Sequence, residues 1–342
     1  MILSVRDLNV SFATDGGLVR AVEGVSFELA KGEILAIVGE SGSGKSVTAQ
    51  TILGLTRAPN ATITGSVQFD GQELTQLDDT QFREIRGKRI AMIFQDPMTS
   101  LNPVYRVGDQ IAEMIRAHRK VSKKEARDSA VDLLRSVGIP NPERRASNYP
   151  HEFSGGMRQR VMIAMALALD PDVLIADEPT TALDVTVQAQ ILRLLDDLNR
   201  ERGLAVVLIT HDLGVVAEIA DRVAVMYAGQ IVEDATLEKL FYDPQHPYTW
   251  GLLGSLARLD QPRPARLAQI AGMPPSLLNP PTGCRFAARC PHEFDKCAEP
   301  PPLHGDRCWL DPADKRRLRD VDGRIGLGKP HLGGPMSQAD AS

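Results

Sequence analysis

A glycine-rich segment at residues 39–46 has the spacing of a phosphate-binding loop. Its sequence, Gly39-Glu40-Ser41-Gly42-Ser43-Gly44-Lys45-Ser46, matches G-x-x-x-x-G-K-[ST] at every fixed position. Glycines let a backbone wrap closely around phosphates, and the N-terminal end of a following helix favours negative charge. We expect Lys45 to reach two of the phosphates and the Ser46 hydroxyl to bind Mg²⁺. The residues expected to contact the ligand here are Gly39, Ser41, Gly42, Ser43, Gly44, Lys45, Ser46 and Val47.

Two adjacent carboxylates, Asp177 and Glu178, directly follow an apolar run at 173–176. Asp177 fits the acidic residue that holds Mg²⁺ in P-loop enzymes. Glu178 is then placed to polarise an attacking water. A solvated acidic strand end would explain the pair alone, but the phosphate loop upstream favours the catalytic interpretation.

A second helix start also has the character of a phosphate-binding end. Ser154 precedes a helical stretch that runs to about residue 169, and Gly155 and Gly156 open it. Ser154 can cap this helix, and the paired glycines expose its first amides. An ordinary capped helix with a glycine-rich entry is the alternative for this motif taken alone.

Elements with strand and helix periodicity must position these motifs. Short, nearly continuous apolar runs at 34–38, 173–176 and 205–209 predict buried parallel strands. Apolar residues at helical spacing predict an amphipathic helix over 185–199. The alternation indicates an α/β layered domain with a mostly parallel sheet. Segment 39–46 then follows a strand and precedes a helix, which disfavours a chance glycine-rich turn.

Composition divides the chain into regions. Residues 1–235 carry the strand–helix alternation, which a predicted helical insertion interrupts at about 96–160. Residues 236–330 form a C-terminal extension whose many prolines disfavour long helices and sheets. Residues 331–342 are rich in Gly, Ser and Ala, and we expect them to be a disordered tail.

Charge and hydropathy exclude several classes of protein. The chain has 342 residues and a net charge of −5, whereas a generic nucleic-acid binder would carry a basic excess. We therefore expect no nucleic-acid partner. No apolar run approaches the roughly 20 residues of a membrane span. The first residues lack the pattern of a secretory signal, so we expect a cytoplasmic protein whose cysteines stay reduced.

The cysteines are Cys284, Cys290, Cys297 and Cys308. Their spacing, C-x5-C-x6-C-x10-C, lacks the close pairs that are typical of structural zinc sites. A four-thiolate iron–sulfur cluster suits a reduced segment without regular structure, and it would staple a region that cannot build its own core. Zinc and unligated thiols or disulfides stay as alternatives, and we treat His292 and His304 as bystanders.

The ordered series of motifs resembles the ATP-binding-cassette (ABC) family over about residues 1–235. The further matches are Gln95 at the Q-loop, Ser154-Gly155-Gly156 at the signature motif, Asp184 at the D-loop and His211 at the switch histidine. Phe153 and Met157 stand where the commonest signature has Leu and Gln. The resemblance implies a P-loop NTPase fold: a RecA-like parallel sheet core, an antiparallel β edge subdomain, a helical insertion subdomain and here an irregular Cys- and Pro-rich extension.

The resemblance also implies a mechanism in which two cassettes form a head-to-tail dimer around two ATP molecules. Lys45 and Ser46 would hold this chain's ATP, whereas segment 154–156 and Asp184 would serve the nucleotide shared with the partner cassette. Each half-site would thus be completed by the other chain.

Three further residues have roles that the resemblance implies. Glu178 would act as general base, with His211 orienting the water and the γ-phosphate. Gln95 would bind Mg²⁺ and link it to a transmembrane partner. Phe12 is the nearest candidate for stacking on adenine, and a plain core role is the alternative.

Several stretches look like the peptide-importer branch of this family, which also contains nickel and glutathione importers. They are residues 39–46, 94–103, 157–160, 246–249 and 272–275. The resemblance then reaches about residue 310 and implies a [4Fe–4S] cluster on the four cysteines, besides ATP and Mg²⁺.

We therefore expect an ATP hydrolase that is the peripheral ATPase subunit of a bacterial di-/oligopeptide importer, at the cytoplasmic face of the inner membrane. Expected partners are two transmembrane permeases, a second homologous ATPase and an extracytoplasmic substrate-binding protein. Nickel chelates or glutathione are alternative cargoes. A soluble cassette acting on nucleic acid or ribosomes, or a redox or metal regulator built around the cysteines, is a more distant alternative.

Overall fold

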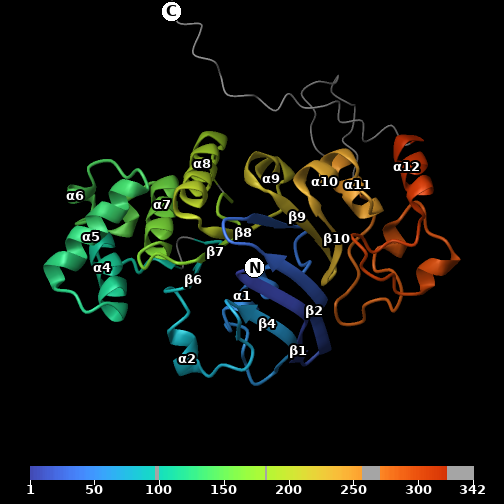
Figure 1. Ribbon diagram of the computed structural model, residues 1–342, viewed down its shortest axis with the longest axis horizontal. Helices are drawn as coiled ribbons and strands as arrows, with labels where there is room; N and C mark the ends of the chain where they lie inside the picture. Colours follow the sequence, from blue (N-terminus) through green and yellow to red (C-terminus); the bar gives the residue numbers. More distant parts are fainter. Residues whose placement is uncertain (97–99, 182, 256–269, 322–342) are drawn as a thin grey trace, which may run out of the picture.

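The computed structural model describes residues 1–96, 100–181, 183–255 and 270–321, which contain two β-sheets with helices around them (Figure 1). The larger sheet has the order β10-β9-β3-β8-β7-β6. Its strands are β3 (Ile34–Val38), β6 (Ile90–Ile93), β7 (Val173–Asp177), β8 (Ala205–Thr210), β9 (Arg222–Tyr227) and β10 (Gln230–Thr236). All neighbours pair in parallel except β10, which is antiparallel to β9. The predicted α/β fold with a mostly parallel sheet is confirmed.

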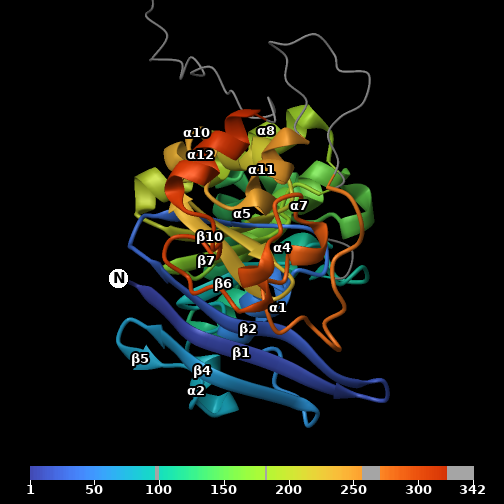
Figure 2. The same cartoon turned by 90° about the vertical axis from the view of Figure 1, so that its right-hand side faces the viewer.

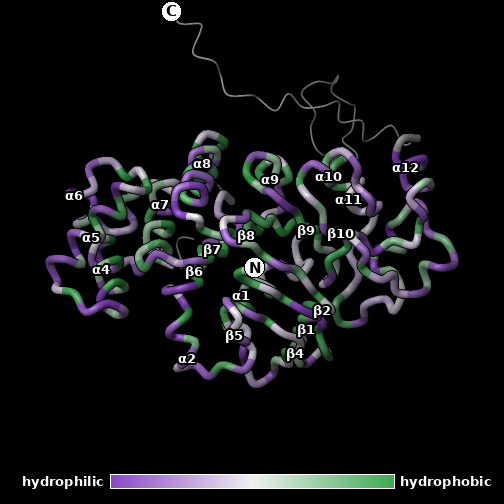
Figure 3. The backbone as a smooth tube through the Cα atoms, viewed as in Figure 1, coloured by the Kyte–Doolittle hydropathy of each residue, from purple (hydrophilic) through white to green (hydrophobic). Residues whose placement is uncertain are grey.

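The central strands β3, β7 and β8 are buried along their whole length. Helices and the second sheet cover both faces, so side chains pointing either way lie in apolar surroundings. Hydrophobic segments accordingly lie at β7 and β8 in Figure 3. This is the physical reason for the uninterrupted apolar runs that precede the phosphate loop and the two carboxylates.

The smaller sheet is antiparallel and has the order β2-β1-β4-β5. Its strands are β1 (Leu3–Thr14), β2 (Gly17–Leu29), β4 (Ala61–Phe69) and β5 (Gln72–Glu73). Figure 2 shows this sheet below the larger one. One hydrophobic core joins Val5 and Phe27 of this sheet to Ile52 of α1 (Lys45–Ile52) and Leu35 of β3. The two sheets thus hold α1, whose first turn follows the phosphate loop, between them.

A group of helices gathers at one end of the molecule (Figure 1). It consists of α4 (Val107–His118), α5 (Lys123–Ser136), α6 (Pro142–Arg145), the 3-10 turn η1 (Pro150–Glu152) and α7 (Gly155–Ala166). Ser122 and Glu125 form a reciprocal cap at the start of α5. Ile111, Leu134 and Val161 share one core with Ala176 and Leu208 of the parallel strands, so this group is fixed to the sheet that carries the carboxylates.

The remaining helices belong to the sheet-bearing core and to the C-terminal region. They are α2 (Asp79–Arg83), α8 (Val185–Arg202), α9 (Leu213–Ile219), α10 (Leu237–Tyr242), α11 (Pro247–Gly254), the 3-10 turns η2 (Ala287–Arg289) and η3 (Asp295–Ala298), and α12 (Pro312–Val321). Gly203, with φ 64°, ends α8. None of the helices described is long and apolar enough to cross a membrane. Segment 331–342, expected to be disordered, lies outside the described residues.

Residues 237–255 and 270–321, called the tail below, dock on the larger sheet. Tyr227 of β9 lies 4.5 Å from Tyr248 of α11 and 5.4 Å from Phe286, measured between ring centroids. Tyr248 and Phe286 also lie 5.4 Å apart, so the three rings form one cluster. Such tilted and edge-on pairs add to the stabilisation from buried area. The tail therefore has a defined seat on the sheet despite its prolines.

Candidate functional site

The phosphate loop (39–46) curls between the end of β3 and the start of α1. Gly39 and Gly44 have φ of 153° and 101°. A Cβ at Gly39 would lie 2.0 Å from the carbonyl oxygen of Met226, and one at Gly44 would lie 2.5 Å from that of Ala21. Neither position can hold a side chain, because rigid backbone occupies the space. A Cβ at Gly42, by contrast, would meet nothing within 4 Å.

Lys45 directs its ammonium group into this loop. Nζ donates to the carbonyl oxygens of Gly39 at 2.7 Å and Glu40 at 3.0 Å, and the side chain is buried. Burial lowers the pKa of Lys45, while the charges of Glu178, Asp177 and Glu40 oppose that shift. A cation enclosed by a glycine-rich loop is a suitable partner for phosphate oxygens.

Ser46 and Asp177 lie side by side although 131 positions separate them. The Ser46 hydroxyl donates to Oδ1 of Asp177 at 3.1 Å, which joins the first turn of α1 to the end of β7. Burial raises the pKa of Asp177, and the hydrogen bond from Ser46 opposes this. Mg²⁺ is commonly held by one or two protein oxygens together with phosphates and waters. This hydroxyl–carboxylate pair fits such an ion.

Three side chains contact the carboxylate of Glu178. Oε2 accepts from Nε2 of Gln95 at 3.1 Å and from the hydroxyl of Thr181 at 2.8 Å, and Oε1 lies 3.3 Å from Nδ1 of His211. The residue adopts φ 48°, and its backbone N–H donates to the carbonyl of Ile209 at 2.8 Å. The strand β8 thus fixes the turn that aims the carboxylate.

These contacts determine the charge state of Glu178. Burial alone would raise its pKa, but the hydrogen bonds from Thr181 and His211 and the charges of His211 and Lys45 outweigh burial and lower it. A carboxylate that is ionised near neutral pH and half-buried can accept a proton from water. Thr181 was not singled out from the sequence. Its place three residues after Glu178, in the turn that follows β7, is the signal that could have found it.

The second helix start carries Ser154 as its cap. The Ser154 hydroxyl accepts from the backbone N–H of Met157 at 3.3 Å, and Gly155 and Gly156 form the first turn of α7. Asp184 caps α8 in the same way, with Oδ1 accepting from the N–H of Val187 at 3.0 Å. Within the described residues, no hydrogen bond joins Ser154 to the phosphate loop of its own chain. The exposed helix end is thus free to meet a ligand held elsewhere.

Comparisons with known proteins identify the family. Residues 22–181 match the family described as ABC transporter, and residues 232–297 match the one described as oligopeptide/dipeptide transporter, C-terminal region. The chain is 56% identical over 317 residues to the dipeptide transport ATP-binding protein DppD of Bacillus subtilis (strain 168), covering 90% of this chain and 94% of that protein. This chain belongs to the ABC transporter family. It is an ATP-hydrolysing cassette protein of that family.

Other relatives of this ABC ATPase agree with that assignment. It is 53% identical over 302 residues to the oligopeptide transport ATP-binding protein OppD of Escherichia coli (strain K12), covering 88% of this chain and 89% of that protein. Its fold matches the dimeric post-hydrolysis structure of the ATP-binding cassette MJ0796 bound to ADP and Pi, with a TM-score of 0.62 and 30% identity. That match covers 69% of this chain and 98% of the other.

Two predicted nucleotide contacts lie at the edge of the core of this ABC ATPase. Phe12 on β1 and Val47 on α1 are both half-buried and pack against the core that the two sheets share. Packing of this kind agrees with the plain core role of Phe12. Its stacking on adenine stays a prediction.

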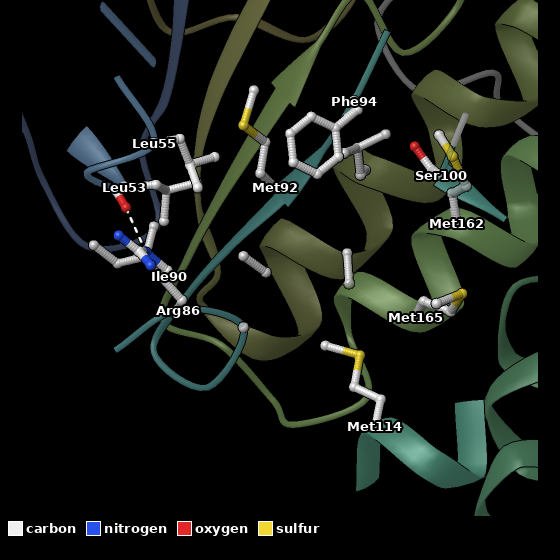
Figure 4. A pocket seen from close by; sticks show the side chains of 14 residues that line it. Leu53, Leu55, Arg86, Ile90, Met92, Phe94, Ser100, Met114, Met162 and Met165 are labelled. Carbon is white, nitrogen blue, oxygen red and sulfur yellow. Dashed lines mark hydrogen bonds between the residues drawn. The ribbon is translucent and has the colours of Figure 1, made fainter. Parts of the chain in front are cut away.

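A groove lies between the β-sheet core and the helical group of this ABC ATPase. Its volume is about 260 Å³. Figure 4 shows Leu53 and Leu55 on one side and Met114, Met162 and Met165 on the other. Phe94, which is 40% exposed, also lines it and directly precedes Gln95. The lining is mainly apolar and rich in flexible methionines, which adapt to a partner's surface.

The four cysteines of this ABC ATPase line one narrow cavity of about 10 Å³, room for one water-sized group. His292, which was expected to be a bystander, lines it too. All four thiols are free of disulfides, and burial raises the pKa of Cys290 to about 12 and that of Cys308 to about 11. In the part of the chain that the structure describes, no three His, Cys, Asp or Glu side chains are arranged to hold a single metal ion.

Proposed function

We propose that this chain is the ATPase subunit of a bacterial ABC importer that takes up di- and oligopeptides, and that it works at the cytoplasmic face of the inner membrane. The observation that carries the proposal is the meeting of Gln95, Glu178 and His211 at the end of β7, beside the phosphate loop and Asp177. The match of residues 232–297 to the oligopeptide/dipeptide transporter C-terminal region, and the peptide transport names of the relatives, support the cargo.

The geometry supports a division of labour in hydrolysis. The loop amides and Lys45 bind the phosphates, and Ser46 and Asp177 would hold Mg²⁺, which neutralises phosphate charge when bound. Glu178 accepts a proton from the attacking water, while His211 orients that water through the carboxylate. The water's oxygen forms the new bond to the γ-phosphorus, and ADP leaves with the bridging oxygen.

We propose that hydrolysis needs a second, homologous ATPase subunit. The capped start of α7 at Ser154 offers amides to a phosphate, yet it makes no hydrogen bond to the phosphate loop of its own chain within the described residues. A head-to-tail pair would bring this end, and Asp184 at the start of α8, to the partner's nucleotide. Closing that pair around ATP is the step that does mechanical work on the importer.

We propose that the apolar groove receives a short helix from one of the two cognate transmembrane permeases. Its volume of about 260 Å³ suits a few apolar side chains of such a helix. Since Phe94 lines the groove and Gln95 touches Glu178, a helix seated there would contact the chain next to the hydrolytic carboxylate. A substrate-binding protein outside the membrane would complete the importer.

We propose that Cys284, Cys290, Cys297 and Cys308 hold a [4Fe–4S] cluster. All four thiols line one cavity, and the backbone N–H of Cys284 donates to the carbonyl of Cys297 at 2.9 Å. A single zinc ion would need four thiolates about 2.3 Å from one point. A cluster would take one thiolate from each of the four cysteines, and the cavity would have to widen to admit it. Bound there, the group would staple the tail.

The cluster is tested by purifying the chain without oxygen and measuring iron, acid-labile sulfide and zinc. About four irons and four sulfides per chain, lost in C290S, are expected for this ligand set. One zinc per chain, or no metal, would overturn the cluster and leave the ATPase function standing.

The transport function is tested by uptake in a bacterium that lacks its own copy of this gene. The wild-type chain should restore uptake of a labelled dipeptide or oligopeptide, and E178Q should not. Nickel or glutathione uptake, measured in parallel, covers the alternative cargoes. Restored nickel or glutathione uptake without peptide uptake would contradict the peptide assignment.

A further inference from the structure

A salt bridge joins the tail to the phosphate loop. Nη1 and Nη2 of Arg289 lie 2.7 Å and 3.1 Å from the two carboxylate oxygens of Glu40, so the guanidinium binds the carboxylate with both prongs. The two side chains are 5% and 29% exposed, respectively. Two further hydrogen bonds fix the Arg289 guanidinium. Nε donates to the carbonyl of Ala271 at 2.9 Å, and Nη1 donates to the Tyr227 hydroxyl at 3.2 Å.

A second tail residue holds the backbone of the same loop residue. The Tyr248 hydroxyl accepts from the backbone N–H of Glu40 at 3.0 Å, and the Tyr248 side chain is fully buried. On the other side, the carbonyl oxygen of Glu40 accepts from Nζ of Lys45. The tail thus fixes both the side-chain carboxylate and the backbone N–H of Glu40. The backbone carbonyl of the same residue contacts Lys45.

We propose that Arg289 is a positioning residue for ATP binding: it holds the Glu40 carboxylate away from Lys45 and the phosphates, so that the seated tail sets the affinity of the loop for ATP. This rests on the proposed binding of ATP by the phosphate loop. It assigns the tail a role at the nucleotide, in addition to any role of its cysteines.

Electrostatics gives the direction of the effect. An acidic side chain inside a phosphate-binding loop repels the ligand, and it also competes for the lysine that must bind the phosphates. Glu40 already influences Lys45, since its charge favours the ammonium form and raises the pKa of Lys45 against burial. Pairing with Arg289 satisfies the carboxylate in a fixed direction. Without Arg289, the carboxylate is free to turn toward the Lys45 ammonium group or toward the phosphates.

The test measures the Kd for ATP of the full-length chain by calorimetry, in the presence of Mg²⁺. R289Q should bind ATP about tenfold more weakly, because it leaves Glu40 charged and unpaired. E40Q/R289Q removes the unpaired charge, so it should bind ATP several-fold more tightly than R289Q. An unchanged Kd in R289Q would overturn the proposal, and so would a double variant as weak as R289Q alone.

A matched control separates this contact from general loosening of the tail. Arg285 is 2% exposed and pairs with Glu23 on β2 at 2.8 Å, so it has the burial and the kind of partner that Arg289 has, but its partner lies outside the loop. R285Q should keep the Kd for ATP within about twofold of the wild type. Equal weakening in R285Q and R289Q would assign the effect to tail docking and overturn the role of Arg289.

A conservative change in the loop keeps the test decisive if R289Q does not fold. E40D retains the charge but is one methylene too short for the two-pronged contact, so it should bind ATP several-fold more weakly than E40Q. Equal affinities of E40D and E40Q would overturn the proposal. If the folded wild-type chain itself bound no ATP, the proposed function would fail, which is a distinct result.

Discussion

The side-chain amide of Gln95 donates to Oε2 of Glu178 over 3.1 Å and thereby connects the segment after β6 to the end of β7. Phe94, the residue before Gln95, lines the apolar groove between the sheet and the helical group. A partner that fills this groove therefore contacts the chain one residue from Gln95, which touches the Glu178 carboxylate. The contact gives a short physical route from partner docking to the surroundings of the Glu178 carboxylate.

Replacing Glu178 by Gln should abolish hydrolysis and preserve ATP binding. The amide has nearly the same shape but cannot accept the proton from water, so the rate should fall by about 10²-fold or more. The Kd for ATP should stay within about threefold of the wild type, because Lys45 and the loop amides are intact. Phosphate release and calorimetry measure the two quantities. A hydrolysis rate near that of the wild type would remove Glu178 from the mechanism.

Replacing Thr181 by Val should move the acid limb of the rate profile to higher pH. The Thr181 hydroxyl donates to the Glu178 carboxylate at 2.8 Å and favours its charged form. Its loss raises the pKa of Glu178, so that a higher pH is needed to keep the base ionised. Rates of ATP hydrolysis at a series of pH values, for the variant and the wild type, report the shift. A shift to lower pH would contradict this account.

Placing a charge in the groove should uncouple the chain from its permeases. Leu55 lines the groove and is 45% exposed, so L55E should fold and bind ATP normally. A desolvated carboxylate at an apolar contact is costly, and peptide uptake should fall at least about tenfold. The control is L278E, because Leu278 is similarly exposed at 38% but lies outside the groove. Equal uptake by the two variants would argue against docking in the groove.

Sequence reasoning succeeded where chemistry and local pattern coincide. The loop 39–46 follows a strand of five apolar residues, so both its position and its ligand could be predicted. The meeting of Gln95, Glu178 and His211 came from family resemblance, because no local pattern brings together residues that lie at the ends of β6, β7 and β8. The contact of Arg289 with Glu40 spans 249 positions and depends on how the tail folds, which neither periodicity nor motif spacing encodes.

Replacing Gly156 by Ala should destabilise the packing of α7 against α8. A Cβ at Gly156 would lie 2.5 Å from Cγ1 of Val187, and the contact is between two packed helices. We expect a loss of about 1–3 kcal/mol in the free energy of unfolding, measured with urea. V187A should recover much of that loss in the double variant.

The matched control for this clash is Gly155→Ala, one position earlier in α7. Its Cβ would lie 3.8 Å from Leu183, an ordinary contact, and both variants make the same change in helix propensity. A stability loss in G155A as large as that in G156A would mean that the clash with Val187 is not the cause.

Two buried groups, Glu233 of β10 and His246 of the tail, should give the free energy of unfolding opposing pH dependences. Burial raises the pKa of Glu233 to about 7, although its carboxylate accepts from the backbone N–H groups of Gln245 and His246. Folded Glu233 thus keeps its proton after the unfolded chain has lost it, and stability falls as the pH rises from about 4.5 to 7. Burial, reinforced by the charge of Lys315, lowers the pKa of His246 to about 3. The stability that depends on neutral His246 is fully present above about pH 6.5 and is lost as the pH falls.

Between about pH 4.5 and 6.5, Glu233 and His246 change the free energy of unfolding in opposite directions as the pH changes. The two effects should therefore largely cancel in the wild type. E233Q removes one of them, so its free energy of unfolding should drop by about 1.4 kcal/mol for each pH unit below 6.5. H246N should show the reverse, with stability falling as the pH rises. Urea unfolding at a series of pH values measures both slopes. Parallel profiles for the two variants would mean that these groups do not titrate in opposition, because each variant retains the group that the other lacks.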